Sequence, residues 1–195
     1  MYTDLLDKGY ASLRRGDPDA ALIRFRHATE SEPERPQAYF GIAMVYLEQD
    51  SRDETVNALE KALSVDPLYI PARAYLGIEY LKRYDVVRAE EELERAHKDE
   101  PTNLLAHLKY AEYYYRMGFY NRSVEMLERG LKGQHGSNEH VVAMARQLLG
   151  QARQKSKNIV LRELPDPRGW LRLFARFMPR KGDVTSASAT TVEMR

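Results

Sequence analysis

Small and large side chains alternate along this chain in a pattern that repeats every 34 residues. One series of small residues comprises Gly9, Ala43, Gly77, Ala111 and Ala145. Two series of large residues keep the same interval and consist of Phe25, Leu59, Leu93 and Leu127, and of Tyr46, Tyr80, Tyr114 and Leu148. A period of this length indicates tandem copies of one supersecondary unit, in which each copy buries its apolar face against the next.

The apolar spacing within each unit predicts two amphipathic α-helices of about a dozen residues joined by a short turn. Helix-start signals agree with this prediction. Asp17 followed by Pro18 suits an N-cap and the first helical position, and Asp85 can cap the corresponding helix of the third unit. Ser51 and Glu54 have the spacing of a capping box. The small residues let the paired helices approach closely where they cross.

Residues 72–101, ARAYLGIEYLKRYDVVRAEEELERAHKDEP, show the full order of small, aromatic and proline positions. In this order the chain resembles the tetratricopeptide repeat (TPR) family, although Ser12 replaces a usual aromatic and His135 a usual proline. The resemblance implies an all-α fold, a right-handed superhelix (α-solenoid) of about four helix-turn-helix repeats. The predicted repeats are residues 2–35, 36–69, 70–103 and 104–137, followed by a capping helix at 138–156.

Charge is distributed unevenly along the 195 residues, whose formal net charge is +1. Residues 157–181 carry seven basic and two acidic side chains, so the basic character belongs to the C-terminal region. No basic stripe runs along the repeats, and nucleic acid is therefore not a predicted partner. The absence of cysteine excludes disulfides and thiol catalysis and fits a reducing compartment. We expect a cytoplasmic protein.

No group of residues predicts catalysis. His135 and His140 lie five positions apart and not at the i, i+4 spacing that places two metal ligands on one helix face. The acidic run at 90–94 has basic neighbours and predicts a solvated helix face with ion pairs. No phosphate-binding loop followed by lysine occurs. We therefore expect no enzyme and no catalytic, cofactor or metal site.

The first helix of each unit carries a second apolar stripe beside the one expected in the core. By resemblance to the TPR family, this stripe lines the concave groove with Leu6, Tyr10, Leu13, Phe40, Met44, Leu47, Ile78, Leu81, Leu108 and Tyr115. One interpretation is that neighbouring helices bury the stripe; the other is a groove for an amphipathic helix or an extended peptide. The acidic C-terminus of a heat-shock chaperone does not fit, because its charges would face apolar side chains without partners.

Residues 157–166 read as a linker, 167–179 as an amphipathic helix and 180–195 as a disordered tail. Aromatic and aliphatic residues cover one side of the predicted helix and arginines the other: Trp170, Leu171, Leu173, Phe174 and Phe177 against Arg172 and Arg176. Such a helix requires a surface that buries its apolar side. Three surfaces remain open: the chain's own groove or flank, an anionic membrane, or another protein.

These features predict a non-enzymatic adaptor, scaffold or chaperone-like module that binds an apolar peptide or helix of a protein partner. Its own C-terminal helix is one candidate occupant of the groove. The alternative is a peripheral membrane-associated assembly factor tethered to anionic lipid by that helix. Repeat surfaces serve many ligands, so the sequence predicts neither the identity of the partner nor the oligomeric state.

Overall fold

A computed structural model describes residues 1–132 and 138–157 of the chain. This part of the chain contains helices and turns and no strand, which confirms the predicted all-α class. Its helices are α1 (Tyr2–Arg14), α2 (Pro18–Ser31), α3 (Pro36–Glu48), α4 (Arg52–Val65), α5 (Ile70–Lys82), α6 (Val86–Asp99), α7 (Leu104–Arg116), α8 (Tyr120–Lys132) and α9 (Glu139–Lys157). The predicted helix at 167–179 and the segments on either side of it, 158–166 and 180–195, lie outside the described residues.

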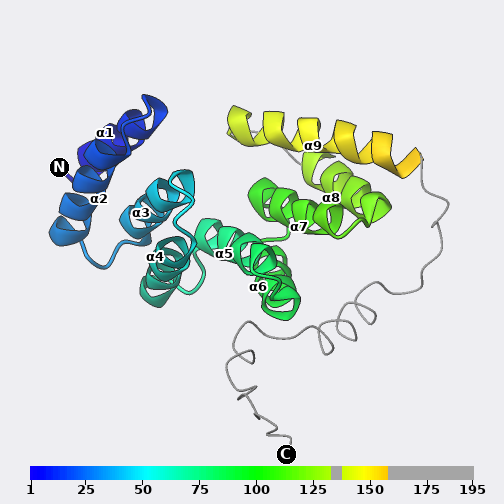
Figure 1. The fold of residues 1–195 in the computed structure, drawn as a ribbon, viewed down its shortest axis with the longest axis horizontal. Coiled ribbons are helices and arrows are strands. Elements are labelled where there is room, and N and C mark those ends of the chain that lie inside the picture. The colour runs from blue at the N-terminus through cyan, green and yellow to red at the C-terminus, as the bar shows by residue number, and fades with distance from the viewer. Residues whose placement is uncertain (133–137, 158–195) are drawn as a thin grey trace, which may run out of the picture.

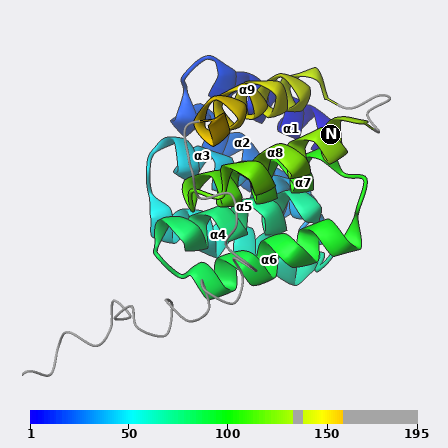
Figure 2. The ribbon, with the colours of Figure 1, turned by 90° about the vertical axis from the view of Figure 1, so that its right-hand side faces the viewer.

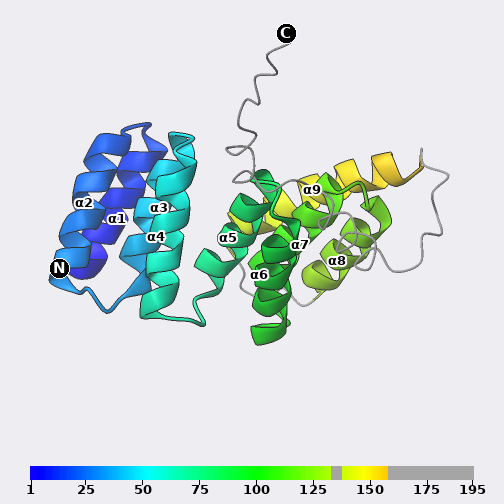
Figure 3. The same ribbon diagram turned by 60° about the horizontal axis from the view of Figure 1, so that its bottom comes forward.

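Consecutive helices form antiparallel pairs that stack in chain order into a curved solenoid (Figure 1). Figure 3 shows the first two pairs, α1 with α2 and α3 with α4, side by side as neighbouring layers. The second helices α2, α4 and α6 lie on the outer side of the curve in Figure 1, and α1, α3 and α5 lie on its inner side. Helix α9 packs against α7 and α8, at the upper side of the end-on view in Figure 2.

Glycines allow the close helix crossings that the small-residue series predicts. The fully buried ring of Phe25 in α2 lies against the backbone of α1 and α3. A Cβ atom at Gly9 would lie 2.6 Å from the Phe25 ring, and one at Gly41 only 2.5 Å from it. Leu93 meets Gly77 in the same way, at 2.6 Å. Any larger residue at these glycines would force the helices apart.

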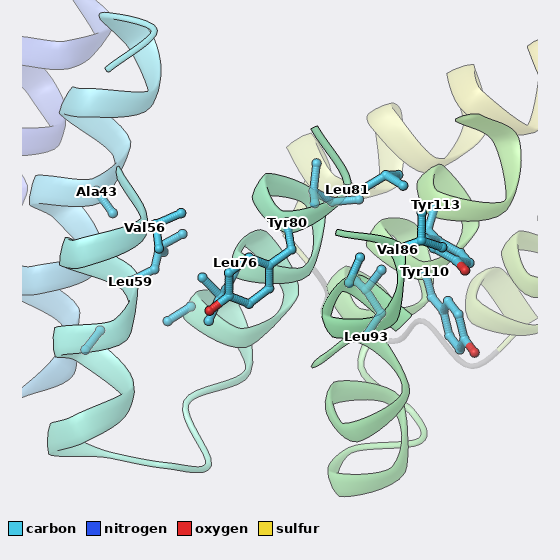
Figure 4. Close-up of a cluster of buried hydrophobic side chains, with 14 of the residues drawn as sticks. Ala43, Val56, Leu59, Leu76, Tyr80, Leu81, Val86, Leu93, Tyr110 and Tyr113 are labelled. Atoms are coloured by element: carbon cyan, nitrogen blue, oxygen red, sulfur yellow. The ribbon is translucent and has the colours of Figure 1, made fainter. Parts of the chain in front are cut away.

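The largest buried cluster occupies the middle of the solenoid and joins α3 to α7. In Figure 4, Val56 and Leu59 of α4 point toward Leu76 and Tyr80 of α5. Because each helix pair buries apolar side chains against its neighbours, this cluster joins the second, third and fourth repeats.

Two of the three predicted helix caps are present. The Asp17 carboxylate accepts a hydrogen bond from the backbone N–H of Ala20 at 3.0 Å, and Asp85 accepts one from Arg88 at 3.2 Å. The predicted capping box at Ser51 is wrong, because its side chain makes no capping hydrogen bond. The Ser51 N–H, which Glu54 would have to satisfy, already donates to the carbonyl of Tyr46 at 2.9 Å.

The turn inside each helix pair contains one residue in the left-handed region of φ. These residues are again 34 apart: Gly16 (φ 73°), Asp50 (φ 52°), Tyr84 (φ 61°) and Gly118 (φ 83°). Glycine adopts this conformation without steric cost, whereas a bulky L-residue does not. Tyr84 therefore holds a strained backbone, and its side chain is 77% exposed.

We predict that Tyr84→Gly raises the free energy of unfolding by roughly 0.5–1 kcal/mol, after the higher entropy of glycine in the unfolded chain is subtracted. Tyr84→Ala is the matched control and should change stability little, because alanine keeps the strained φ. Gly118→Ala should destabilise by about 1 kcal/mol, since no atom lies within 4 Å of the added Cβ and only the backbone conformation opposes it. Urea denaturation of the three variants tests this set. Equal stabilities of Tyr84→Gly and Tyr84→Ala would contradict it.

Candidate functional site

We call the side of the solenoid formed by α1, α3, α5 and α7 the inner surface. Seven of the predicted groove residues on these helices have partly exposed side chains: Leu6, Tyr10, Leu13, Phe40, Met44, Leu47 and Tyr115. Five of the seven, Leu6, Tyr10, Leu13, Phe40 and Met44, also pack in part against buried clusters. The other three predicted residues are buried in the core: Ile78 is 3% exposed, Leu81 9% and Leu108 2%. In the described structure these three side chains are not available to a ligand.

Neighbouring helices cover the three buried residues. Ile78 and Leu81 belong to the same core cluster as Tyr113 of α7. Leu108 packs in a second cluster that includes Leu149 of α9. The first interpretation of the stripe, burial by adjacent helices, therefore holds for α5 and the start of α7. The partly exposed apolar residues that remain belong mainly to α1 and α3.

Aromatic side chains from α3 and α5 meet on this part of the molecule. The Phe40 ring lies edge-on to Tyr75 with 5.5 Å between ring centroids, and edge-on to Tyr69 with 5.8 Å. Sequence reasoning missed Tyr69 and Tyr75. Tyr69 directly precedes α5 at its N-cap position, where a turn residue is expected, and Tyr75 is not among the predicted groove residues. The repeat pattern gives no signal for Tyr75, because Gly41 and Lys109 occupy the equivalent positions of the neighbouring units.

The tyrosines of α1 and α5 are close enough to influence one another electrostatically. Burial, and then the charges that Tyr69, Tyr2 and Tyr75 acquire on ionisation, raise the pKa of the Tyr10 phenol above its ordinary value of 10.0. Burial also raises the pKa of Tyr69 to about 12, with smaller contributions from Tyr2 and Asp66. Burial in apolar surroundings thus favours the neutral form of both phenols.

This environment predicts a loss of stability in alkali. A phenol whose pKa is about 12 when folded and 10.0 when unfolded stabilises the protein fully below pH 10. That contribution disappears as the pH rises from 10 to 12, because the buried phenol must then ionise. We expect the urea midpoint to fall over this range, and to fall less steeply in Tyr69→Phe. Lysine deprotonation over the same pH range affects both proteins equally, so a difference between them reports on Tyr69. If the urea midpoint falls equally steeply with pH in both proteins, the assignment is contradicted.

A charged group on α7 borders the aromatic residues. The ammonium of Lys109, whose side chain is 8% exposed, lies 4.1 Å from the centre of the Tyr75 ring and 3.0 Å from the Glu112 carboxylate. Arg116 binds the other Glu112 oxygen at 2.8 Å. Burial raises the pKa of the Glu112 carboxyl, but the two cations outweigh burial and the net shift is downward. Glu112 therefore stays ionised at neutral pH and pairs within the chain.

Neither a group of His, Cys, Asp and Glu side chains that could hold a metal nor a membrane span is found where the chain is described. In residues 1–132 and 138–157, no group of three or more His, Cys, Asp or Glu side chains could hold a metal ion. No helix in these ranges is long and apolar enough to cross a membrane. The predicted docking or membrane residues of the C-terminal helix fall outside the described ranges: Trp170, Leu171, Leu173, Phe174, Phe177, Arg172 and Arg176.

Helix pairs repeated every 34 residues and stacked into a curved layer, with apolar residues on the inner helices, define an α-solenoid repeat protein. Residues 36–67 match the family model for the tetratricopeptide repeat. This match and the described fold support a TPR family protein.

Similar proteins agree with this assignment. Interferon-induced protein with tetratricopeptide repeats 3 of Mus musculus is 23% identical over 129 residues, which are 65% of this chain and 32% of that protein. The chain thus spans about a third of that relative's length. The structure of a thermophilic TPR protein of Thermus thermophilus superposes with a TM-score of 0.65 at 18% identity, covering 91% of this chain and 98% of that one.

The first TPR of Spaghetti (RPAP3), solved with a bound HSP90 peptide SRMEEVD, has a similar fold. It superposes with a TM-score of 0.53 at 18% identity, over 60% of this chain and 92% of that chain. At this level of identity the likeness establishes the shared fold.

Proposed function

We propose that this protein is a non-enzymatic interaction adaptor that binds an apolar peptide or amphipathic helix of a partner on the inner surface of α1 and α3, beside the start of α5. The observation that carries the proposal is the group of partly exposed apolar side chains there: Leu6, Tyr10, Leu13, Phe40, Met44 and Leu47. Large, adaptable aromatic and methionine side chains suit the burial of a partner's apolar residues.

The chemistry of this surface favours an apolar ligand over an acidic one. The TPR of Spaghetti (RPAP3) was solved with the peptide SRMEEVD, which contains three acidic residues. The six side chains that form the proposed surface on α1 and α3 carry no positive charge that could pair with an acidic ligand. The cations Lys109 and Arg116 of α7 already bind Glu112. An acidic ligand on α1 and α3 would therefore lose hydration without gaining ion pairs.

Charge placed on the inner surface tests the proposal. We expect Met44→Glu combined with Leu47→Glu to abolish capture of the partners that the wild-type full chain retains from its host lysate. Ile23→Glu is the matched control, because Ile23 lies on α2 and is 56% exposed. Circular dichroism of both variants checks that the fold is kept. Unchanged capture by the folded Met44→Glu, Leu47→Glu variant would refute the proposed site.

The C-terminal segment 167–179 is the occupant that we propose when no partner is bound. Its apolar residues have helical spacing and match the apolar inner surface in character. Because the chain has no cysteine, a spin label can be attached at Ala175→Cys alone. We expect the label to broaden the Met44 methyl signal of the same molecule, and to do so equally after dilution with unlabelled chain. A Met44 signal that stays sharp would contradict docking of segment 167–179 on the inner surface of the same molecule.

Attachment to an anionic membrane through the same segment is the competing proposal. Arg146, Lys155 and Lys157 are exposed on α9 and lead directly into the basic region, which is the observation that favours it. It predicts that the full chain sediments with anionic vesicles and not with zwitterionic ones, and that Trp170→Glu abolishes sedimentation. A chain that stays in the supernatant with both kinds of vesicle would exclude lipid attachment.

A further inference from the structure

Two histidines and a methionine meet where α6, α7 and α8 pack together, away from the proposed peptide surface. The His107 side chain is 4% exposed. Its Nε2 atom lies 2.8 Å from the carbonyl oxygen of Pro101, and its Nδ1 atom lies 3.1 Å from the Sδ atom of Met126. The His97 ring stands edge-on, with 4.6 Å between the two imidazole centroids. The proposed adaptor function uses none of these side chains.

The carbonyl of Pro101 determines which nitrogen of neutral His107 carries the proton. A carbonyl oxygen only accepts hydrogen bonds, so Nε2 must donate to it and Nδ1 keeps its lone pair. That lone pair faces a thioether sulfur, which is also an electron-pair donor. Histidines that bind a metal through one ring nitrogen commonly donate the N–H of the other nitrogen to a backbone carbonyl. His107 has this arrangement, with Nε2–H directed at Pro101 and Nδ1 directed at the sulfur of Met126.

The donor types determine which ion fits. Thioether and imidazole together suit a soft monovalent cation such as Cu(I), whereas calcium and magnesium require oxygen ligands. Metal bonds to nitrogen and sulfur are about 2.0–2.3 Å long, so a single ion can bridge two atoms that are 3.1 Å apart. The flexible Met126 side chain is only partly buried, which gives an ion a route from solvent.

Glycine at position 130 keeps this group of side chains together. A Cβ atom added at Gly130 of α8 would lie 2.7 Å from Cβ of His107. Only glycine therefore lets α8 approach α7 closely enough for Met126, one helical turn earlier, to reach the His107 ring.

We propose that His107 Nδ1 and Met126 Sδ, with the adjoining imidazole of His97, form a binding site for a soft monovalent cation, Cu(I). The site would hold the ion between α7 and α8, and a contact of the ion with His97 of α6 would join this fourth helix pair to the third. The proposal is independent of peptide binding on the inner surface.

Silver(I) is the redox-silent probe for this site. We expect one equivalent of Ag(I) to shift the methyl signal of Met126 and the ring signals of His107 in the full chain. Competition with a bicinchoninate chelator then measures Cu(I) affinity. Met126→Leu should weaken binding roughly tenfold or more while the melting temperature is retained. Met117→Leu, which replaces a partly buried methionine at the end of α7, should leave affinity unchanged.

Two results would overturn the proposal. The first is that Ag(I) leaves the Met126 and His107 signals in place, or that Met126→Leu binds Cu(I) as tightly as the wild type. The second is that the Met126 methyl signal responds to pH in the range where histidine titrates and not to Ag(I). The contact would then be a hydrogen bond from an imidazolium to sulfur, with no ion between the two atoms.

Discussion

Replacing Phe25 by alanine is expected to lower the free energy of unfolding by roughly 3–5 kcal/mol, the usual cost of removing a large aromatic side chain from a core. The Phe25 ring is fully buried and contacts Tyr10 edge-on, with 5.0 Å between centroids. It also fills the space above Gly9 and Gly41. Because those glycines have no side chains that could move into the cavity, little relaxation is available, and the upper part of the range applies.

Ile23→Ala in the same helix is the control for Phe25→Ala. Ile23 is 56% exposed, so its truncation should change stability by no more than about 0.5 kcal/mol. Urea denaturation followed by circular dichroism measures both variants. A Phe25→Ala protein within about 1 kcal/mol of the wild type would contradict the packing described for the first three helices.

The second large effect is expected at Arg73, a buried cation that joins α5 to α6. Its guanidinium binds the Glu92 carboxylate at 2.7 Å, lies 3.8 Å from Asp99 and donates to the carbonyl of Pro67. The Arg73 side chain is 10% exposed and that of Glu92 17%. Arg73→Ala would leave a mostly buried carboxylate whose remaining ion-pair contact, to Arg95, is 3.8 Å long. We expect a loss of roughly 3 kcal/mol.

A double variant separates the ion pair from the space that Arg73 fills. Arg73→Met keeps most of the side-chain volume, and Glu92→Gln removes the stranded charge. The Arg73→Met, Glu92→Gln protein should therefore be clearly more stable than Arg73→Ala. If Arg73→Ala and the double variant are equally unstable, loss of packing and not the stranded carboxylate explains the effect.

The sequence predicted the helix pairs and their period because both depend on local spacing. It did not predict the buried charges of Arg73, Glu79 and Lys109. Glu79 is 1% exposed, and the Lys109 side chain is 8% exposed. Their partners come from tertiary packing or from neighbouring turns, as in the contact of Lys109 with Tyr75. The strained turn residue Tyr84 was also missed, because its backbone conformation follows from the repeat geometry and not from its residue type.

For the candidate site, the sequence identified the apolar positions but not which helices leave them open. Leu108 is buried because α9 packs its own apolar residues against α7, and Ile78 is buried because α7 packs against α5. The periodic pattern assigns all four first helices the same face and cannot distinguish the covered ones. Exposure of Met44 and Leu47 therefore became evident only in the folded arrangement.

Site-specific photo-crosslinking tests the central claim most directly. A benzophenone amino acid replaces Met44 on the inner surface or Ile23 on the outer surface of the full chain, and mass spectrometry maps the adducts formed in the host cell. We predict adducts at position 44 on segments whose apolar residues recur at helical spacing, either in a partner or in residues 167–179, and none at position 23. Adducts at position 23 without any at position 44 would contradict the account.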